Sequence, residues 1–216
     1  MPQWRMFQLS FFLGLCLTIG GSCRSQPNQE ALYCGGLTPE FVQEISLISE
    51  RMQAQQIPYS SGALADCSGI FLRVQDSLQD RCSQHPAPNP SQYRSSRDLA
   101  RWYHEQGQLT LVHDPLAEAG ALKPGMVLFY GQRGDHQKEN VLDDLILPGG
   151  INHLGIVIAV QKDASGQVTN YALFHGLRPG KPAAITRYHT RIPTRNRYPP
   201  FGNGTEPWVA YAPISW

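Results

Sequence analysis

The first part of the chain carries apolar residues at helical spacing. In one segment they recur every three or four positions, at Phe41, Ile45, Ile48 and Met52. This spacing predicts a helix with one apolar face. The preceding residues 38–40, Thr-Pro-Glu, suit a helix start, because a hydroxyl can cap the first turn and proline fits the first helical position. We expect the helix to end near residues 54–56, before Ile57-Pro58.

A second helical pattern begins at Cys67. Its apolar positions are Ile70, Phe71, Val74 and Leu78, and polar residues occupy the other faces. Cys67 therefore falls in the first turn of a predicted helix. A third helix is predicted after the loop at residues 84–92, with Ser95 or Ser96 as its cap and Gly107 at its end.

The pattern changes after residue 123, where short apolar runs replace helical spacing. The runs that predict strands are 126–130, 154–160, 169–174 and 208–211. Helices that precede strands predict an α+β fold, in which an antiparallel sheet packs against the Cys67 helix. The polar segment 131–150 separates the first two strands and contains residues 141–147, which predict a brief helix.

The N-terminal residues 1–22 have the features of an export signal: an early arginine, an apolar run over residues 6–19 and small residues at the end. The run is too short to span a membrane comfortably, which favours removal after export. Cys23 follows directly, as in bacterial lipoprotein signals, so we expect Cys23 to carry lipid and residues 23–36 to form a tether. Ordinary signal cleavage is the alternative. Either outcome locates the protein in the periplasm or cell envelope, with the lipid as its membrane contact.

The charge of the 216-residue chain is nearly balanced, with 18 Lys and Arg against 17 Asp and Glu. Nucleic-acid binding needs a basic surplus on one face, so the balance gives no reason to expect that partner. No cysteine pair has CxxC spacing, and no histidine pair has the spacing of a zinc site. We expect residues 37–216 to form a single, monomeric domain without metal or cofactor.

The cysteines divide by position. Cys16 lies inside the export signal and leaves with it. Export permits a disulfide between Cys34 and Cys82, which would tie the N-terminal arm to the end of the Cys67 helix. Cys67 remains as an odd thiol, which is either buried and inert or reactive for a purpose.

His153 stands at the mouth of a predicted strand. By strand alternation it shares a face with the small or short side chains of Gly155, Val157 and Ala159. We expect that face to let the Cys67 helix approach closely. A catalytic cysteine reacts as a thiolate, which a helix N-terminus and a nearby imidazole both favour. The pattern therefore pairs Cys67 with His153 as nucleophile and base.

A base also needs a partner that orients its second ring nitrogen. His175 ends the strand that follows the strand of His153, so antiparallel pairing would put the two imidazoles side by side. A simple turn residue before Gly176 is the alternative interpretation of His175. Asn152 and His189 are the other candidates for the orienting role.

Together these residues resemble a known family. Tyr59, Gly62 and the run Asp66-Cys67-Ser68-Gly69, followed by a strand after Pro124-Gly125, by His153-Leu154-Gly155-Ile156 and by His175, are similar to the NlpC-type cell-wall cysteine peptidases. The matches occur in the family's order over residues 57–177. The resemblance implies a papain-like fold.

The resemblance also implies an activity: hydrolysis of amide bonds in peptidoglycan stem peptides, commonly the bond from the side-chain carboxyl of D-glutamate to a diamino acid. Cys67 would attack the carbonyl, His153 would act as base and then acid, and His175 would orient His153. Tyr59 would help to stabilise the oxyanion. Asp66 and Ser68 would hold a substrate amine, and Asp66 also suits a helix cap.

The chain departs from the family pattern in two places that matter for the site. Met126 replaces the acid that usually follows the Pro-Gly pair, and segment 131–150 is longer than the expected hairpin. We expect this segment to form a lid or side wall of the cleft. The alternatives are a related cysteine amidase or acyltransferase acting on another amide or ester, and a non-catalytic exported lipoprotein on the same fold. The complete Cys-His-His trio argues against the non-catalytic alternative.

Overall fold

The computed structural model describes residues 36–131 except 61 and 63, together with residues 142–190 and 207–214. The predicted export signal, the lipidation site Cys23 and Cys34 lie outside these residues. The predicted tether lies outside them as well, except for Gly36.

The described chain forms a mixed α+β fold. Its helices are α1 (Pro39–Ala54), α2 (Cys67–Arg81), α3 (Ser96–Glu105), the short α4 (Leu142–Leu145) and the 3-10 helix η2 (Ala117–Ala121). Its strands are β1 (Thr110–Leu111), β2 (Met126–Gly131), β3 (Ile151–Lys162), β4 (Val168–His175), β5 (Ala184–His189) and β6 (Trp208–Pro213). The strands join in the order β1-β6-β2-β3-β4-β5, and every described pair is antiparallel. The predicted α+β class and antiparallel sheet are confirmed.

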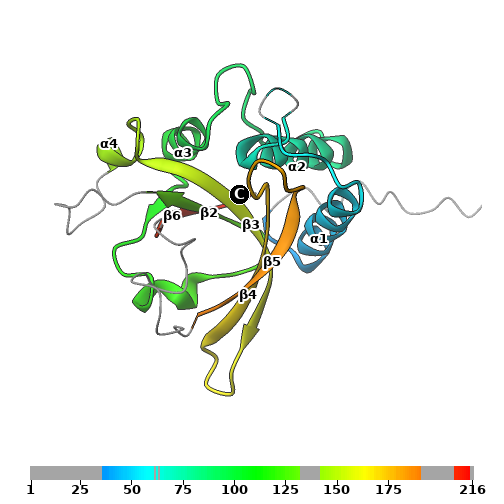
Figure 1. Ribbon diagram of the computed structural model, residues 1–216. Helices are drawn as coiled ribbons and strands as arrows, with labels where there is room; N and C mark the ends of the chain where they lie inside the picture. The colour runs from blue at the N-terminus through cyan, green and yellow to red at the C-terminus, as the bar shows by residue number, and fades with distance from the viewer. Residues whose placement is uncertain (1–35, 61, 63, 132–141, 191–206, 215–216) are drawn as a thin grey trace, which may run out of the picture.

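Helices α1, α2 and α3 cover one face of the sheet, as Figure 1 shows. The apolar positions that defined the helical patterns, among them Ile45, Phe71 and Leu99, are buried there against β2, β3, β4 and β6. A second apolar cluster lies on the opposite face, where Leu122 beside η2 packs with residues such as Leu128 and Trp208. Burial on both faces explains why the central strands appear in the sequence as nearly continuous apolar runs.

Each long helix begins at a capping residue. The Thr38 hydroxyl accepts a hydrogen bond from the backbone N–H of Phe41 at 3.2 Å. Asp66 caps α2 by accepting from the backbone N–H of Gly69 at 2.7 Å. Ser95 and Asp98 cap α3 reciprocally, as a capping box. These contacts confirm the predicted helix starts and fix Cys67 as the first residue of α2.

Strand β5 is the longest element that the sequence pattern missed, beside the short β1 and η2. It lies at the edge of the sheet, its residues are all half-buried or exposed, and they show no regular alternation of apolar and polar side chains. Strand β3 also begins three residues before the predicted position 154, because Ile151 pairs with Gly131 of β2.

The prediction that the small side chains beside His153 receive the Cys67 helix is wrong. The helices pack on the face of β3 that carries Leu154 and Ile156, whereas Val157 belongs to the cluster on the other face. Gly155 makes room for β4 instead of a helix: a Cβ there would lie 2.7 Å from the Leu173 side chain and 3.0 Å from Cβ of His175.

Gly69 offers a test of how tightly the start of α2 is packed. A Cβ at this position would lie 2.3 Å from the backbone carbon of Leu64, so Gly69→Ala must displace the loop that leads to Cys67. We expect a loss of roughly 1–3 kcal/mol in the free energy of unfolding, measured with urea. Gly120→Ala is the control, because nothing lies within 4 Å of its added methyl group. Equal stability of the two variants would contradict this description of the packing.

Candidate active site

The first turn of α2 meets β3 at a stretch of strand edge that β4 leaves open. Pairing between β3 and β4 starts only at Ile156, opposite Phe174. In the open stretch, the Cys67 thiol donates to the backbone oxygen of Asn152 at a sulfur–oxygen distance of 3.8 Å. The backbone N–H of Leu154 also lies beside the sulfur and lowers the pKa of the thiol. The sulfur therefore contacts the backbone of β3 on both sides of His153 in the chain.

Gly176 permits this close approach. Directly after β4 ends, the chain passes the start of α2, and a Cβ on Gly176 would lie 2.7 Å from the carbonyl carbon of Asp66 and 2.8 Å from the backbone nitrogen of Cys67. These neighbours are backbone atoms, which have no rotamer to change. Only glycine fits here without moving either α2 or the end of β4.

Two buried imidazoles form a short polar chain across the neighbouring strands β3 and β4. Nε2 of His153 lies 2.8 Å from Nδ1 of His175, and Nε2 of His175 lies 3.1 Å from the Thr186 hydroxyl on β5. His153 and His175 are 8% and 2% exposed. The predicted side-by-side placement of these histidines is confirmed. Thr186 was not predicted, because its strand was not.

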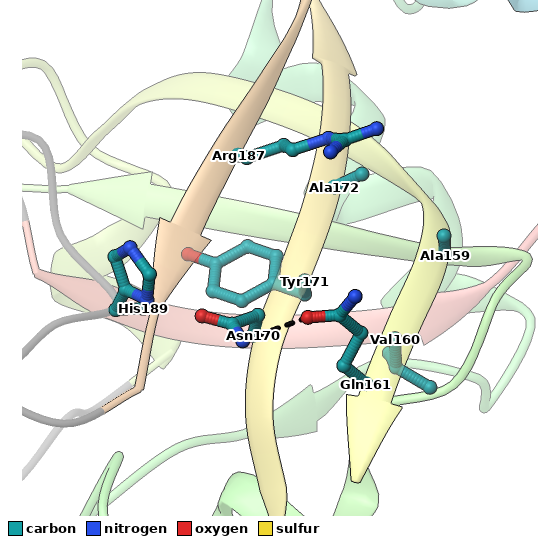
Figure 2. A pocket seen from close by; sticks show the side chains of 8 residues that line it. All are labelled: Ala159, Val160, Gln161, Asn170, Tyr171, Ala172, Arg187 and His189. Atoms are coloured by element: carbon teal, nitrogen blue, oxygen red, sulfur yellow. Dashed lines mark hydrogen bonds between the residues drawn. The ribbon is translucent and has the colours of Figure 1, made fainter.

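The other two candidates for the orienting role lie differently. Asn152 presents its backbone oxygen to the thiol. His189 stands at the far end of β5 and lines a separate cavity of about 280 Å³, together with Arg187 and Asn170 (Figure 2). The structure therefore favours His175 as the neighbour of His153.

The sulfur of Cys67 has no hydrogen bond to His153 in this arrangement. Its side-chain partner is the hydroxyl of Ser96 at 3.4 Å, contributed by the first residue of α3. Cys67 is a free cysteine and is 7% exposed. Of the two ring nitrogens of His153, Nε2 contacts Nδ1 of His175, so a base role for His153 would fall to Nδ1.

Burial sets the charge state of this group. It raises the pKa of the Cys67 thiol, and the Ser96 hydroxyl only partly opposes that effect. Burial lowers the pKa of His153 to about 4 and that of His175 to about 3, with the His153 charge adding to the shift of His175. At neutral pH the resting site thus holds a neutral thiol and neutral imidazoles. Burial thus opposes the thiolate that a helix N-terminus favours.

The thiol opens onto a cleft of about 610 Å³. Its walls come from the loop before α2, the first turns of α2 and α3, and the start of β3; the lining residues are Tyr59, Gly62, Asp66, Cys67, Ser68, Arg94, Ser95, Ser96, Arg97, Gly149, Ile151 and Asn152. Tyr59 lies near Cys67 and Asp66. Burial raises the pKa of its phenol most, and the charges of these two neighbours raise it further. Gly149 and Ile151 show that the end of the 131–150 segment and the residue after it contribute to the cleft wall.

Arg94 is a residue of the cleft wall that the sequence did not reveal. Its guanidinium binds both carboxylate oxygens of Asp66 at 3.0 Å and donates to the Ser68 hydroxyl at 2.7 Å. Asp66 and Ser68 line the cleft, but both already accept hydrogen bonds from Arg94. Their contact with a substrate amine stays a prediction. Arg94 lies in a loop 28 residues after Asp66, and no periodic pattern links the two positions.

Cys82 forms a disulfide at the end of α2. The other described cysteine, Cys67, is free, so the partner of Cys82 lies outside the described residues. The predicted partner Cys34 is among the residues outside them.

In the described part of the chain, no group of three or more His, Cys, Asp or Glu side chains is arranged to hold a metal ion. None of the helices among these residues is long and apolar enough to cross a membrane. Comparison with known proteins finds no match to this chain among family models, curated protein sequences or solved structures.

The buried imidazoles predict a specific loss of stability in acid. His85, His153 and His175 all have a pKa lowered by burial, to about 4, 4 and 3. Their unfolded pKa is about 6.5, so below that pH the unfolded chain binds more protons than the folded one. The free energy of unfolding should therefore fall as the pH drops from 6.5 towards 3.

Urea unfolding at several pH values between 6.5 and 4 measures this slope. His175→Asn removes one buried imidazole and should reduce the slope by up to about 1.4 kcal/mol per pH unit. His104→Gln, at an exposed position of α3, should leave it unchanged. If the free energy of unfolding fell equally steeply with pH in wild type and His175→Asn, His175 would not be the buried, neutral imidazole described here.

Proposed function

We propose that this protein is an exported cysteine peptidase with a papain-like fold, which hydrolyses amide bonds in peptidoglycan stem peptides during cell-wall turnover or remodelling. The bond from the side-chain carboxyl of D-glutamate to a diamino acid is the proposed target. The proposal rests on the resemblance carried by the Asp66–Gly69 run, His153 and His175, and on the geometry around Cys67.

One observation carries most of the weight. The free thiol at the start of α2 lies in an open cleft, against the backbone that flanks a buried imidazole, and that imidazole is held by a second one. A structural cysteine has no need of this setting, whereas a nucleophile needs a base within reach and a partner that orients the base.

In the proposed reaction, the Cys67 thiol and the His153 imidazole are both neutral before attack. For His153 to accept the thiol proton at Nδ1, its Nε2–H must donate to Nδ1 of His175. His175 then carries its own proton on Nε2 and donates it to the Thr186 hydroxyl. As the sulfur bonds to the substrate carbonyl carbon, its proton passes to His153, and the carbonyl oxygen becomes an oxyanion. Tyr59, which stays protonated at neutral pH, is the proposed donor to that oxyanion.

The intermediate then collapses in the usual two stages. The carbon–nitrogen bond breaks, the leaving amine takes the proton from His153, and a thioester to Cys67 remains. Water, deprotonated by His153, attacks the thioester carbonyl and releases the carboxylate product and the thiol. In this scheme no metal or cofactor takes part.

The direct test is cleavage of defined stem peptides. Purified wild type should split a peptide that contains the D-glutamyl–diamino acid bond, and mass spectrometry should find two products whose summed mass exceeds the substrate by one water. Cys67→Ala should lower the rate roughly 1,000-fold or more, since no other group can form the thioester. His104→Gln, prepared identically, guards against a contaminating peptidase. Cleavage that persists in Cys67→Ala would reject Cys67 as the nucleophile.

Thr186 is the proposed positioning residue of the chain of imidazoles. Thr186→Val keeps the shape but removes the acceptor for His175 Nε2–H, so His175 no longer holds the tautomer that orients His153. We expect kcat on the stem peptide to fall roughly 5- to 30-fold with little change in KM. Thr186→Ser restores the hydroxyl and should recover most of the rate. Equal kcat values for the Val and Ser variants would show that the hydroxyl orients nothing.

A further inference from the structure

Arg97 is the second residue of α3 and lines the cleft in front of Cys67. Its side chain is half-buried. Among the described residues it has no hydrogen bond and no ion pair within 4 Å, unlike Arg94 on the same wall. Its charge helps to lower the pKa of the neighbouring Asp98 carboxyl.

The acids around Arg97 are already engaged. Asp98 accepts from the backbone N–H and the hydroxyl of Ser95 in the capping box, at 3.1 and 2.6 Å, and pairs with Arg101 at 3.2 Å. Asp66, the acid that lines the cleft, is held by both ends of the Arg94 guanidinium. The cleft wall therefore carries two arginines against one carboxylate, and the positive charge left over is that of Arg97.

The position of this charge is unfavourable for the protein alone. The N-terminus of a helix carries a partial positive charge, so a cation in the first turn of α3 is repelled rather than stabilised. Partial burial adds to the cost of a guanidinium without a counter-ion. An anion that enters the cleft would remove both penalties, and the same helix end would attract it.

We propose that Arg97 forms an anion subsite that binds a carboxylate on the acyl side of the substrate, next to the carbonyl that Cys67 attacks. The identity of this carboxylate rests on the proposed function. A glutamyl residue linked through its side chain keeps its α-carboxylate free, and this group fits the subsite. A substrate in which that carboxylate is amidated lacks the charge that Arg97 selects.

The subsite is tested without any substrate by two alkylating reagents of nearly equal size. Iodoacetate and iodoacetamide both react with the Cys67 sulfur with loss of iodide, but only iodoacetate carries a carboxylate. The measurement is the ratio of their rates at Cys67, followed by mass spectrometry and normalised to the ratio for glutathione. Arg97→Gln is the test variant. Arg81→Gln makes the same change of charge in the last turn of α2, roughly 20 Å along the helix from Cys67.

We expect the normalised ratio of the iodoacetate rate to the iodoacetamide rate to be at least about 5-fold higher in wild type and in Arg81→Gln than in Arg97→Gln. The difference should shrink as salt is added. Equal ratios in wild type and Arg97→Gln would overturn the proposal. Failure of both reagents to reach Cys67 would also overturn it, because the subsite would then not open onto the sulfur.

Stem peptides separate this proposal from the proposed function. Wild type should cleave a peptide with D-glutamate roughly 10- to 100-fold more efficiently, as kcat/KM, than the same peptide with the α-carboxylate amidated. Arg97→Gln should lose that preference by losing rate on the acidic peptide alone. A normal alkylation result without cleavage of either peptide would leave the anion subsite standing and reject the wall-peptide substrate. Equal cleavage of the two peptides, combined with equal alkylation ratios in wild type and Arg97→Gln, would reject the anion subsite and leave the wall-peptide substrate standing.

Discussion

The site depends on the contact between the first turn of α2 and the open edge of β3. Strand β4 stops at His175, and the backbone groups of β3 beyond that point would be left without a strand partner on that side. Cys67 fills the place, with its sulfur between the oxygen of Asn152 and the N–H of Leu154. Gly176, directly after β4, lets the chain pass close to the start of α2. The end of one strand therefore determines where the Cys67 thiol meets the backbone of β3.

This arrangement has an electrostatic consequence. A thiol packed against a strand is poorly hydrated, and the same burial disfavours a charged imidazole. The resting pair is neutral, with its proton on sulfur. Charge is then created as the sulfur attacks an electrophilic carbon in the cleft. In the proposed function that carbon is the substrate carbonyl, and a donor such as Tyr59 receives the oxyanion.

Much of the frame was predictable from sequence. Helix caps at Thr38, Asp66 and Ser95 and periodic apolar residues define the three long helices, and they put Cys67 at a helix start. The adjacency of His153 and His175 followed from antiparallel pairing of consecutive strands. Local pattern suffices in these cases because the determinants lie within a few residues of one another.

The contacts that the sequence did not reveal join segments that no local pattern connects. Arg94 reaches Asp66 from a loop, and Thr186 comes from an edge strand whose half-exposed residues lack alternation. The face of β3 that meets α2 was assigned wrongly, because small side chains beside His153 suggested room for a helix. Gly155 in fact accommodates the next strand.

The central claim is that His153 accepts the proton of Cys67, although the two side chains share no hydrogen bond at rest. The rate of Cys67 alkylation by a neutral reagent, followed from pH 5 to pH 9 in wild type and His153→Asn, tests it most directly. If His153 is the base, wild type should react at least about 10-fold faster than the variant near pH 7, where an unassisted thiol is mostly protonated. Superimposable pH profiles for the two proteins would contradict the account.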